Sequence, residues 1–255
     1  MRVRSKLTSG LTGIVILTAL TGVGCAAELK VLSTHAALEV LNELGPKFEQ
    51  TTGNKLSFSY DPANVIKRQI ENGATFDVVL ITRSAIDDLT KQGKTLPDTR
   101  ANIGRSGLGV AVRKGALKPD ISTVKAFKQT LLAAKSVIRS TEGNSGIYFE
   151  RLMGQLGIAD QMKGKTKLGP SGRVAEFVAR GEVEIAVQQI SELLPVAGAE
   201  FVGPFPQELQ LYTLFAVAVG AGSKDAKAAK ELVDFLTTPA AASVVKAKGL
   251  EPASN

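Results

Sequence analysis

The sequence predicts an α/β protein built as two lobes. Short apolar strands alternate with amphipathic helical patterns in the order β-α-β-α-β, which is typical of a largely parallel sheet with right-handed crossovers. The alternation starts again after Gly107, without an intervening linker, repeat or low-complexity tract. At 255 residues, of which 44% are hydrophobic, the chain is long enough for two cores.

Each element of the first half follows from a local pattern. Leu38, Leu41, Leu44 and Phe48 recur at helical spacing, and Gly53 is placed to end that helix. The stretch FDVVLI is of the type that is buried on both faces of a parallel sheet. We therefore expect strands at residues 29–33, 55–60 and 76–81 and helices at residues 36–51 and 65–72.

The second half is interpreted in the same way. Ser122 and Thr123 precede one helical pattern and Ser171 another, which suggests N-caps, and Pro239 breaks the last clear helix. The expected strands are residues 108–113, 136–139, 183–188 and 212–219. The expected helices are residues 124–134, 144–157, 174–180 and 226–237, with a short one ending near residue 248.

The first 27 residues have the layout of a secretory signal peptide. Basic residues at positions 2, 4 and 6 precede an apolar stretch at 11–23 and the small residues around Cys25. Gly22 stands where a lipoprotein signal has a large aliphatic residue, so we favour cleavage after Ala27 over lipidation of Cys25. Cleavage lowers the formal charge from +7 to +4 and leaves no cysteine.

The composition excludes several chemistries. With one His and one Cys, a Cys/His zinc site cannot be assembled, and neither a metal nor a cofactor is expected. A Ser-His-Asp triad would have to use His35, and no G-x-S-x-G motif accompanies it, so no enzyme activity is expected. The chain has no Lys/Arg runs and only 5% aromatic residues, which argues against nucleic-acid binding.

Four turns that lead from strands into helices are candidate anion sites, because free N–H groups at helix starts attract anions. They are residues 33–36, 60–64, 141–146 and 169–173, all rich in Gly, Ser, Thr or Asn. Ordinary helix capping explains each turn equally well, and His35 is either a ligand donor or a cap. Arg83, Arg139 and Arg173 would suit a carboxylate if buried, or are solvated.

The order of motifs resembles a known family. The segments VLSTHAAL, FEQTTG, RQIENGATFDVVL, SGIY and VDFLTTPAAASVVKAKGL together look like the periplasmic molybdate-binding proteins of ABC transporters. The resemblance covers nearly all of residues 29–250 and implies the two-lobed type II periplasmic-binding-protein fold, with two crossing hinge strands at residues 108–113 and 211–219. The implied lobe 1 is residues 28–108 and 214–255, and lobe 2 is residues 109–213.

This family binds its oxyanion through two Ser hydroxyls, amides at helix starts and one Tyr hydroxyl. The Ser positions correspond to Ala36 and Ala63 here, and the Tyr position to Gln188, so these donors are replaced. His35, Asn64, Arg139 and Gln188 could instead form a pocket for a small organic acid. The complete set of candidate ligand-binding residues is Thr34, His35, Ala36, Asp61, Ala63, Asn64, Arg83, Arg139, Ser145, Gly146, Ser171, Arg173 and Gln188.

The expected function is that of a monomeric periplasmic solute-binding protein. It would bind a small anion, such as molybdate or an organic acid, between two closing lobes and deliver it to the membrane permease of an ABC transporter. Two alternatives stay open: a sensor that presents its closed form to a receptor or sensor kinase, and a secreted hydrolase that uses His35 and a Ser.

Overall fold

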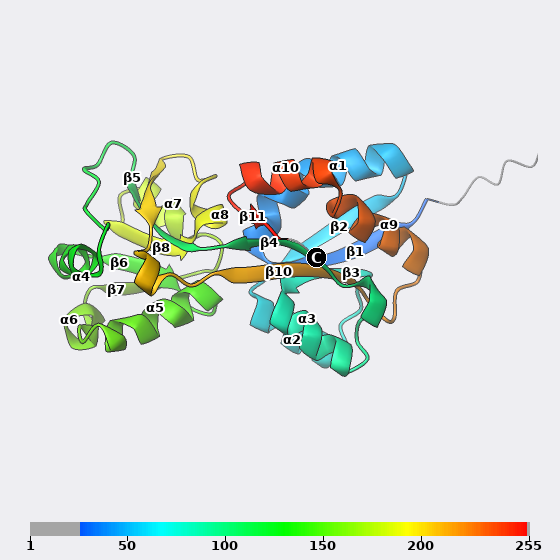
Figure 1. Ribbon diagram of the computed structural model, residues 1–255, viewed down its shortest axis with the longest axis horizontal. Coiled ribbons are helices and arrows are strands. Elements are labelled where there is room, and N and C mark those ends of the chain that lie inside the picture. Colours follow the sequence, from blue (N-terminus) through cyan, green and yellow to red (C-terminus); the bar gives the residue numbers. More distant parts are fainter. Residues whose placement is uncertain (1–25, 254–255) are drawn as a thin grey trace, which may run out of the picture.

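The computed structural model describes residues 26–253, which form two lobes, each built on one β-sheet (Figure 1). The predicted signal peptide lies outside the described residues, apart from Ala26 and Ala27. Within residues 26–253, no helix is both long and apolar enough to cross a membrane.

Lobe 1 contains a six-stranded sheet in the order β11-β4-β10-β3-β1-β2. Strand β1 pairs in parallel with β2 and β3, as the alternating pattern predicts, whereas β10 is antiparallel to both β3 and β4. The strands are β1 (Glu28–Ser33), β2 (Lys55–Tyr60), β3 (Val78–Thr82), β4 (Ala101–Ser106), β10 (Thr213–Val219) and β11 (Glu251–Pro252).

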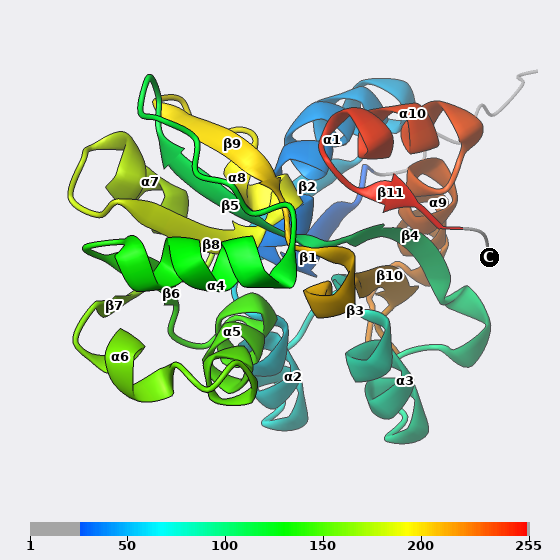
Figure 2. The same ribbon diagram turned by 60° about the vertical axis from the view of Figure 1, so that its left-hand side comes forward.

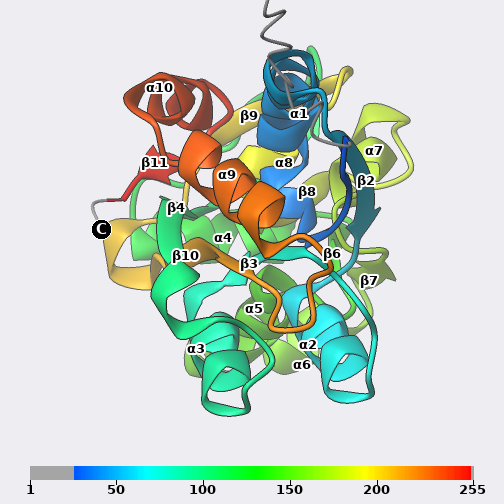
Figure 3. The same ribbon diagram turned by 90° about the vertical axis from the view of Figure 1, so that its right-hand side faces the viewer.

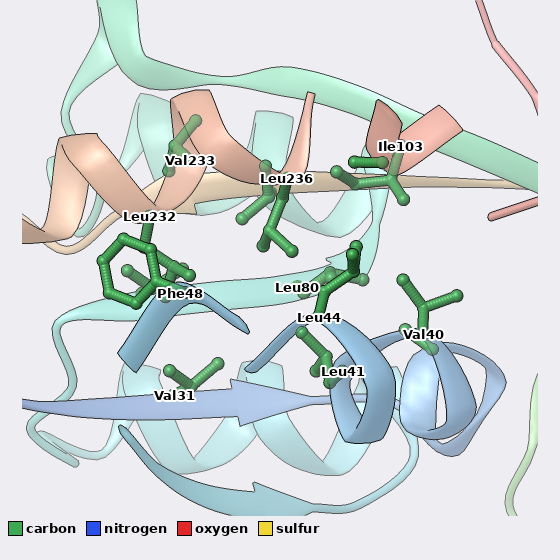
Figure 4. Packing of buried hydrophobic residues seen from close by; sticks show 14 of the residues in the cluster. Val31, Val40, Leu41, Leu44, Phe48, Leu80, Ile103, Leu232, Val233 and Leu236 are labelled. Carbon is green, nitrogen blue, oxygen red and sulfur yellow. The ribbon is translucent and has the colours of Figure 1, made fainter. Parts of the chain in front are cut away.

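Helices cover both faces of the lobe 1 sheet (Figure 3). One face carries η1 (His35–Ala37), α1 (Leu38–Thr52), α9 (Ala226–Leu236) and α10 (Pro239–Ala247). The other carries α2 (Ala63–Glu71) and α3 (Arg83–Lys91), and η2 (Pro97–Thr99) precedes β4. Phe48 of α1 lies near Leu232 of α9 (Figure 4), and its ring meets that of Phe235 edge to face with centroids 5.6 Å apart.

Lobe 2 contains a five-stranded sheet in the order β7-β6-β8-β5-β9 (Figure 2). The strands are β5 (Leu108–Arg113), β6 (Val137–Ser140), β7 (Thr166–Gly169), β8 (Ile185–Gln189) and β9 (Ala199–Pro204). Its helices are α4 (Val124–Ala133), α5 (Asn144–Gln155), α6 (Ala159–Lys163), α7 (Val174–Ala179) and α8 (Ile190–Leu193). Separate apolar clusters lie on the two faces of the sheet, so each lobe has its own core.

The chain crosses between the lobes twice. It passes from β4 to β5 through Gly107, and it returns from β9 to β10 through residues 205–212, which include η3 (Gln207–Leu209). Gln210 ties the crossings together: Leu108 N donates to its Oε1 at 2.7 Å, and its Nε2 donates to Leu108 O at 2.9 Å. The lobes are therefore joined by two short segments that are hydrogen-bonded to each other.

The structure corrects several details of the sequence prediction. Helices α3, α6 and α8 and strands β4, β7, β9 and β11 were not predicted from the sequence, because they are short or carry polar residues that interrupt the apolar pattern. Pro239 begins α10, with Thr238 as the N-cap. A proline is tolerated at the first helical position because an N–H group there has no carbonyl partner within the helix. Ser171 does not cap α7, whose N-cap is Arg173, whereas Thr123 caps α4 as expected.

Candidate ligand site between the lobes

A pocket lies between the lobes, and we call it the central pocket. Lobe 1 lines it with the residues after β1, the start of α2 and parts of β3 and β10. Lobe 2 lines it with the end of β6, the start of α5, Ser171, the end of β8 and α8. The carboxyl ends of β1, β6 and β8 thus face one another, as expected for ligand sites in α/β sheets.

The lobe 1 wall is largely apolar. Ala36 and Ala63 are buried and line the pocket beside Pro62. They present methyl groups at the positions that the sequence resemblance aligns with serines of the molybdate-binding family. Thr34 is held by its backbone, because Thr34 N donates to Leu80 O at 3.0 Å. Within residues 26–253 its buried hydroxyl has no hydrogen-bond partner. Thr82 of β3 and Thr213 of β10 also line this wall, and the Thr213 hydroxyl is paired with the Gln189 amide.

The lobe 2 wall is polar. Ser140 ends β6, and Gly143, Asn144 and Ser145 form the start of α5, whose first backbone amides have no carbonyl one turn earlier. Among the described residues, the enclosed hydroxyls of Ser140 and Ser171 have no hydrogen-bond partner. Buried polar groups are seldom left unpaired, so these groups are ready to bind a ligand.

Gly146 allows this arrangement. A Cβ atom at this position would lie 2.0 Å from the carbonyl oxygen of Ser140, a distance that no real contact reaches. Only glycine lets the first turn of α5 approach the end of β6 so closely. Gly146 therefore acts through packing: it brings the helix start and Ser140 to the same wall, although it does not line the pocket itself.

Two neighbouring glutamines at the end of β8 play different parts. The amide of Gln189 bonds to the hydroxyl of Thr213 at 3.0 Å, and its nitrogen then reaches the carbonyl oxygen of Ser106, also at 3.0 Å. Gln189 thereby fastens lobe 2 to the first crossing. Gln188 is 1% exposed, and neither atom of its amide makes a regular hydrogen bond within the described chain. It lies beside the Glu192 carboxyl group, and this interaction lowers the pKa of Glu192.

Glu192, on α8, brings a carboxyl group to the pocket. The residue as a whole is only partly buried, but its carboxyl group is enclosed, and this burial raises its pKa to about 8. Interactions with the Gln188 side chain and the Gln189 backbone lower the pKa but do not cancel the effect of burial. Within residues 26–253, no Lys or Arg lines the pocket to balance a charge on this carboxyl group.

His35 faces Glu192 from the lobe 1 side. Burial lowers its pKa below 6.5, while nearby Asp61 raises it and Arg173 lowers it, so the imidazole is neutral near pH 7. A Cβ atom on Gly172 would lie 2.3 Å from Cγ of His35, which shows that the lobes are in close contact here. The positive φ of 78° at Gly172 is a second reason for glycine at this position.

A second pocket adjoins the central one, and we call it the side pocket. His35 and Glu192 line both pockets and so stand at the junction between them. The side pocket also contains Tyr60, whose pKa is raised to about 12, mainly by burial. Arg173 lies there as well, paired with Glu176 through two hydrogen bonds of 2.9 Å.

The structure brings about half of the candidate residues together. Those that line the central pocket are Thr34, His35, Ala36, Ala63, Ser145, Ser171 and Gln188. The others lie outside its lining, and several have partners elsewhere: Arg83 pairs with Asp87 at 3.8 Å and Arg139 with Glu150 at 2.9 Å. Asp61 accepts from Gln69 at 3.1 Å, Asn64 from the amide of Val65 at 3.0 Å, and Arg173 binds Glu176.

The lining residues that the sequence analysis did not select include Ser140, Gln189 and Glu192. Ser140 and Gln189 end buried strands, where a polar residue after an apolar run is a usable signal. Glu192 lies in a four-residue helix whose pattern resembles a loop, so nothing in its local sequence marks it. No group of three or more His, Cys, Asp or Glu side chains within the described residues is arranged to hold a metal ion.

Comparison with known proteins identifies the family, because residues 29–251 match the model of the bacterial extracellular solute-binding proteins. The chain belongs to this family. Aconitate isomerase from a Pseudomonas species is 36% identical over 230 residues, which are 88% of this chain and 87% of that protein. The molybdate-binding protein ModA of Azotobacter vinelandii is 27% identical, covering 88% of this chain and 90% of that protein.

The fold of this solute-binding protein is also shared. The solved periplasmic molybdate-binding protein of Azotobacter vinelandii superposes with a TM-score of 0.75 over 89% of this chain and 100% of that one, at 19% identity. The resemblance seen in the sequence and the two-lobed type II fold are thus confirmed. The family consists mainly of binding proteins, yet one relative bears the name of an enzyme, so the expected lack of activity stays a prediction.

Proposed function

We propose that this solute-binding protein binds a small organic carboxylate in the central pocket and delivers it to the permease of an ABC transporter. The observation that carries the proposal is the composition of the two walls. Lobe 2 offers the unpaired hydroxyls of Ser140 and Ser171, the Gln188 amide and the start of α5. Lobe 1 offers the methyl groups of Ala36 and Ala63 beside the hydroxyl of Thr34.

This composition suits a carboxylate better than a tetrahedral oxyanion. A tetrahedral anion presents oxygens in all directions and needs donors from both walls, and each missing charged hydrogen bond costs about 1.5–3 kcal/mol. A carboxylate can direct its oxygens toward Ser140 and Ser171 while its carbon skeleton rests against the methyl groups of lobe 1.

Delivery would follow from closure of the lobes. A ligand that contacts both walls favours the closed form, in which α8 of lobe 2 packs against η1 of lobe 1. The periplasm is the proposed compartment, and a membrane permease, or a sensor kinase in the alternative role, would recognise the closed form. These roles share one ligand-binding step.

Thermal unfolding with a panel of anions tests the proposal. Citrate, cis-aconitate and trans-aconitate should raise the melting temperature, because a ligand at a hundred times its Kd adds about 2.7 kcal/mol of stability. Molybdate and sulfate serve as matched oxyanions. A shift with molybdate at micromolar concentration and none with the carboxylates would overturn the proposal.

A second candidate function is isomerisation of an unsaturated carboxylate in the same pocket. Neutral His35 and Glu192 line it from opposite lobes, so one could remove a proton from the substrate's methylene carbon while the other returns one across the shifted double bond. The 36% identical relative named aconitate isomerase supports this candidate. Incubation of trans-aconitate in D₂O tests it: appearance of the cis isomer carrying deuterium supports catalysis, and an unchanged spectrum leaves binding alone.

A further inference from the structure

Glu192 places a carboxyl group in the pocket where the proposed ligand brings its own negative charge. No Lys or Arg among the described residues lines the pocket to offset a negative charge on Glu192. An ionised Glu192 would therefore repel the ligand at close range in a site shielded from water. The same carboxyl group, when protonated, is neutral and has an O–H donor.

We propose that Glu192 is a specificity-determining residue whose protonated carboxyl group donates a hydrogen bond to the bound carboxylate, so that binding of the ligand takes up a proton. The inference rests on the proposed function. A protonated Glu192 also favours ligands whose carboxylates are fully ionised. Such ligands have only acceptor oxygens, so they accept a hydrogen bond from Glu192 without offering a competing donor.

The surroundings of Glu192 support this assignment. On its own lobe, the Gln188 amide lies beside the carboxyl group and can hold one of its oxygens while the O–H points to the ligand. The burial that raises the pKa of Glu192 to about 8 keeps it protonated in the ligand-free protein at neutral pH. Ligand binding removes more water and adds negative charge, so it raises this pKa further.

The other ionisable groups around Glu192 are distinguishable from it by pH. They line the side pocket, and they are His35 and Tyr60 from lobe 1, Arg173 and Glu176 from lobe 2, and Glu39 of α1. His35 has a lowered pKa, while the pKa values of Tyr60 and Arg173 are raised and that of Glu176 is lowered, so none of these four changes charge between pH 7 and 9. The variant Glu39→Gln tests whether Glu39 contributes to the proton uptake.

Calorimetric titration of the mature protein with trans-aconitate and with citrate tests the inference. At each pH, the titration is repeated in several non-anionic buffers that differ in ionisation enthalpy. The slope of the measured binding enthalpy against the buffer's ionisation enthalpy gives the number of protons taken up per ligand. For trans-aconitate, which is ionised throughout this range, we expect about zero protons taken up per ligand at pH 6, a fraction near pH 8 and about one at pH 9. The Kd should rise about tenfold from pH 8.5 to pH 9.5.

Two variants complete the experiment. Glu192→Gln keeps a donor at every pH, so it should abolish the uptake and bind at pH 9 at least as tightly as the natural protein. Glu39→Gln, which removes an acid of the side pocket alone, should leave the uptake unchanged. Binding at pH 9 without proton uptake overturns this inference only, and it does so in the natural protein even if Glu192→Gln fails to fold. Absence of binding of both carboxylates from pH 6 to 9 overturns the proposed function itself.

Discussion

The lobe 1 wall of the central pocket presents methyl groups at Ala36 and Ala63, whereas the lobe 2 wall presents hydroxyls at Ser140 and Ser171. Both walls are built in the same way, from the ends of parallel strands and the starts of the helices that follow them. The difference therefore lies in the side chains, and the backbone frame is common to both lobes. The comparison indicates that the shared backbone arrangement determines where a ligand binds, whereas a few side chains determine which ligand is bound.

The largest expected effect comes from the place where the lobes meet. Gly172→Ala places a methyl group against His35, where the structure leaves no room, and it also strains the backbone at a positive φ. We expect the affinity for trans-aconitate to fall at least about 100-fold, because the clash opposes closure by several kcal/mol. Calorimetry measures the loss.

Gly157→Ala is the matched control for that change. Gly157 has a φ of 65°, and no atom lies within 4 Å of the place that a Cβ methyl group would occupy. This variant therefore carries the backbone strain without the clash between lobes. It should lower the stability of lobe 2 and leave the affinity unchanged. Equal losses of affinity in both variants would show that contact between His35 and Gly172 is irrelevant to closure.

The next effect separates the two walls. Ser140→Ala removes a lobe 2 donor and should weaken carboxylate binding about 10- to 150-fold, the range for a lost hydrogen bond to a charged group. Thr34→Val removes the corresponding hydroxyl of lobe 1 and should weaken binding by less than about tenfold. Titration of both variants with trans-aconitate measures the difference, and a larger loss with Thr34→Val would reverse the assigned roles of the walls.

A smaller effect follows from restoring donors to lobe 1. The double variant Ala36→Ser, Ala63→Ser adds two buried hydroxyls to the lobe 1 wall, at the positions that the sequence resemblance aligns with serines of the molybdate-binding family. Molybdate affinity should rise about tenfold for each hydroxyl, while carboxylate affinity should fall because the methyl surface is lost. Competition between molybdate and citrate measures this shift, and no gain for molybdate would show that the lobe 1 wall does not select the ligand.

A separate effect is on stability and not on affinity. The folded-state pKa of Glu192, about 8, exceeds its ordinary value of 4.5, so its contribution to stability is complete below pH 4.5 and is lost as pH rises toward 8. The slope from one group is at most about 1.4 kcal/mol per pH unit. Glu192→Gln should remove this pH dependence of the unfolding free energy, which urea unfolding between pH 5 and 8 measures.

His35 acts in the opposite direction. Its folded-state pKa lies below 6.5, so the folded protein prefers the neutral imidazole and loses stability as pH falls below 6.5. His35→Gln should flatten the acid side of the profile only. A profile that stays unchanged in both variants would show that neither group titrates in the pocket.

Much of the fold could be predicted from the chain. Residues 55–60 and 108–113 form strands with the expected bounds, because each lies between clear turn signals and has a regular apolar pattern. The missed elements include β4 (Ala101–Ser106) and α8 (Ile190–Leu193), which meet where the amide of Ser191 donates to the hydroxyl of Ser106 at 3.4 Å. Their apolar pattern is weak because their partners come from distant parts of the chain.

The candidate site was predicted less completely, and for a related reason. Turns with small polar residues indicated Ser145 and Ser171, which line the pocket. The same criterion indicated Asn64, which does not line the pocket. A turn that binds a ligand and one that only caps a helix share the same composition. The arginines illustrate the same limit, since Arg139 is buried as a carboxylate-binding residue would be, yet it faces Glu150.

The sequence established the alternating α/β pattern and the two lobes, because apolar periodicity is a local property of the chain. The three-dimensional arrangement established which residues share one pocket. Glu192 and His35 lie far apart in the sequence, yet α8 packs against η1 and brings both to the same cavity. Burial there shifts their pKa values in opposite directions, and burial depends on contacts between lobes that no local pattern encodes.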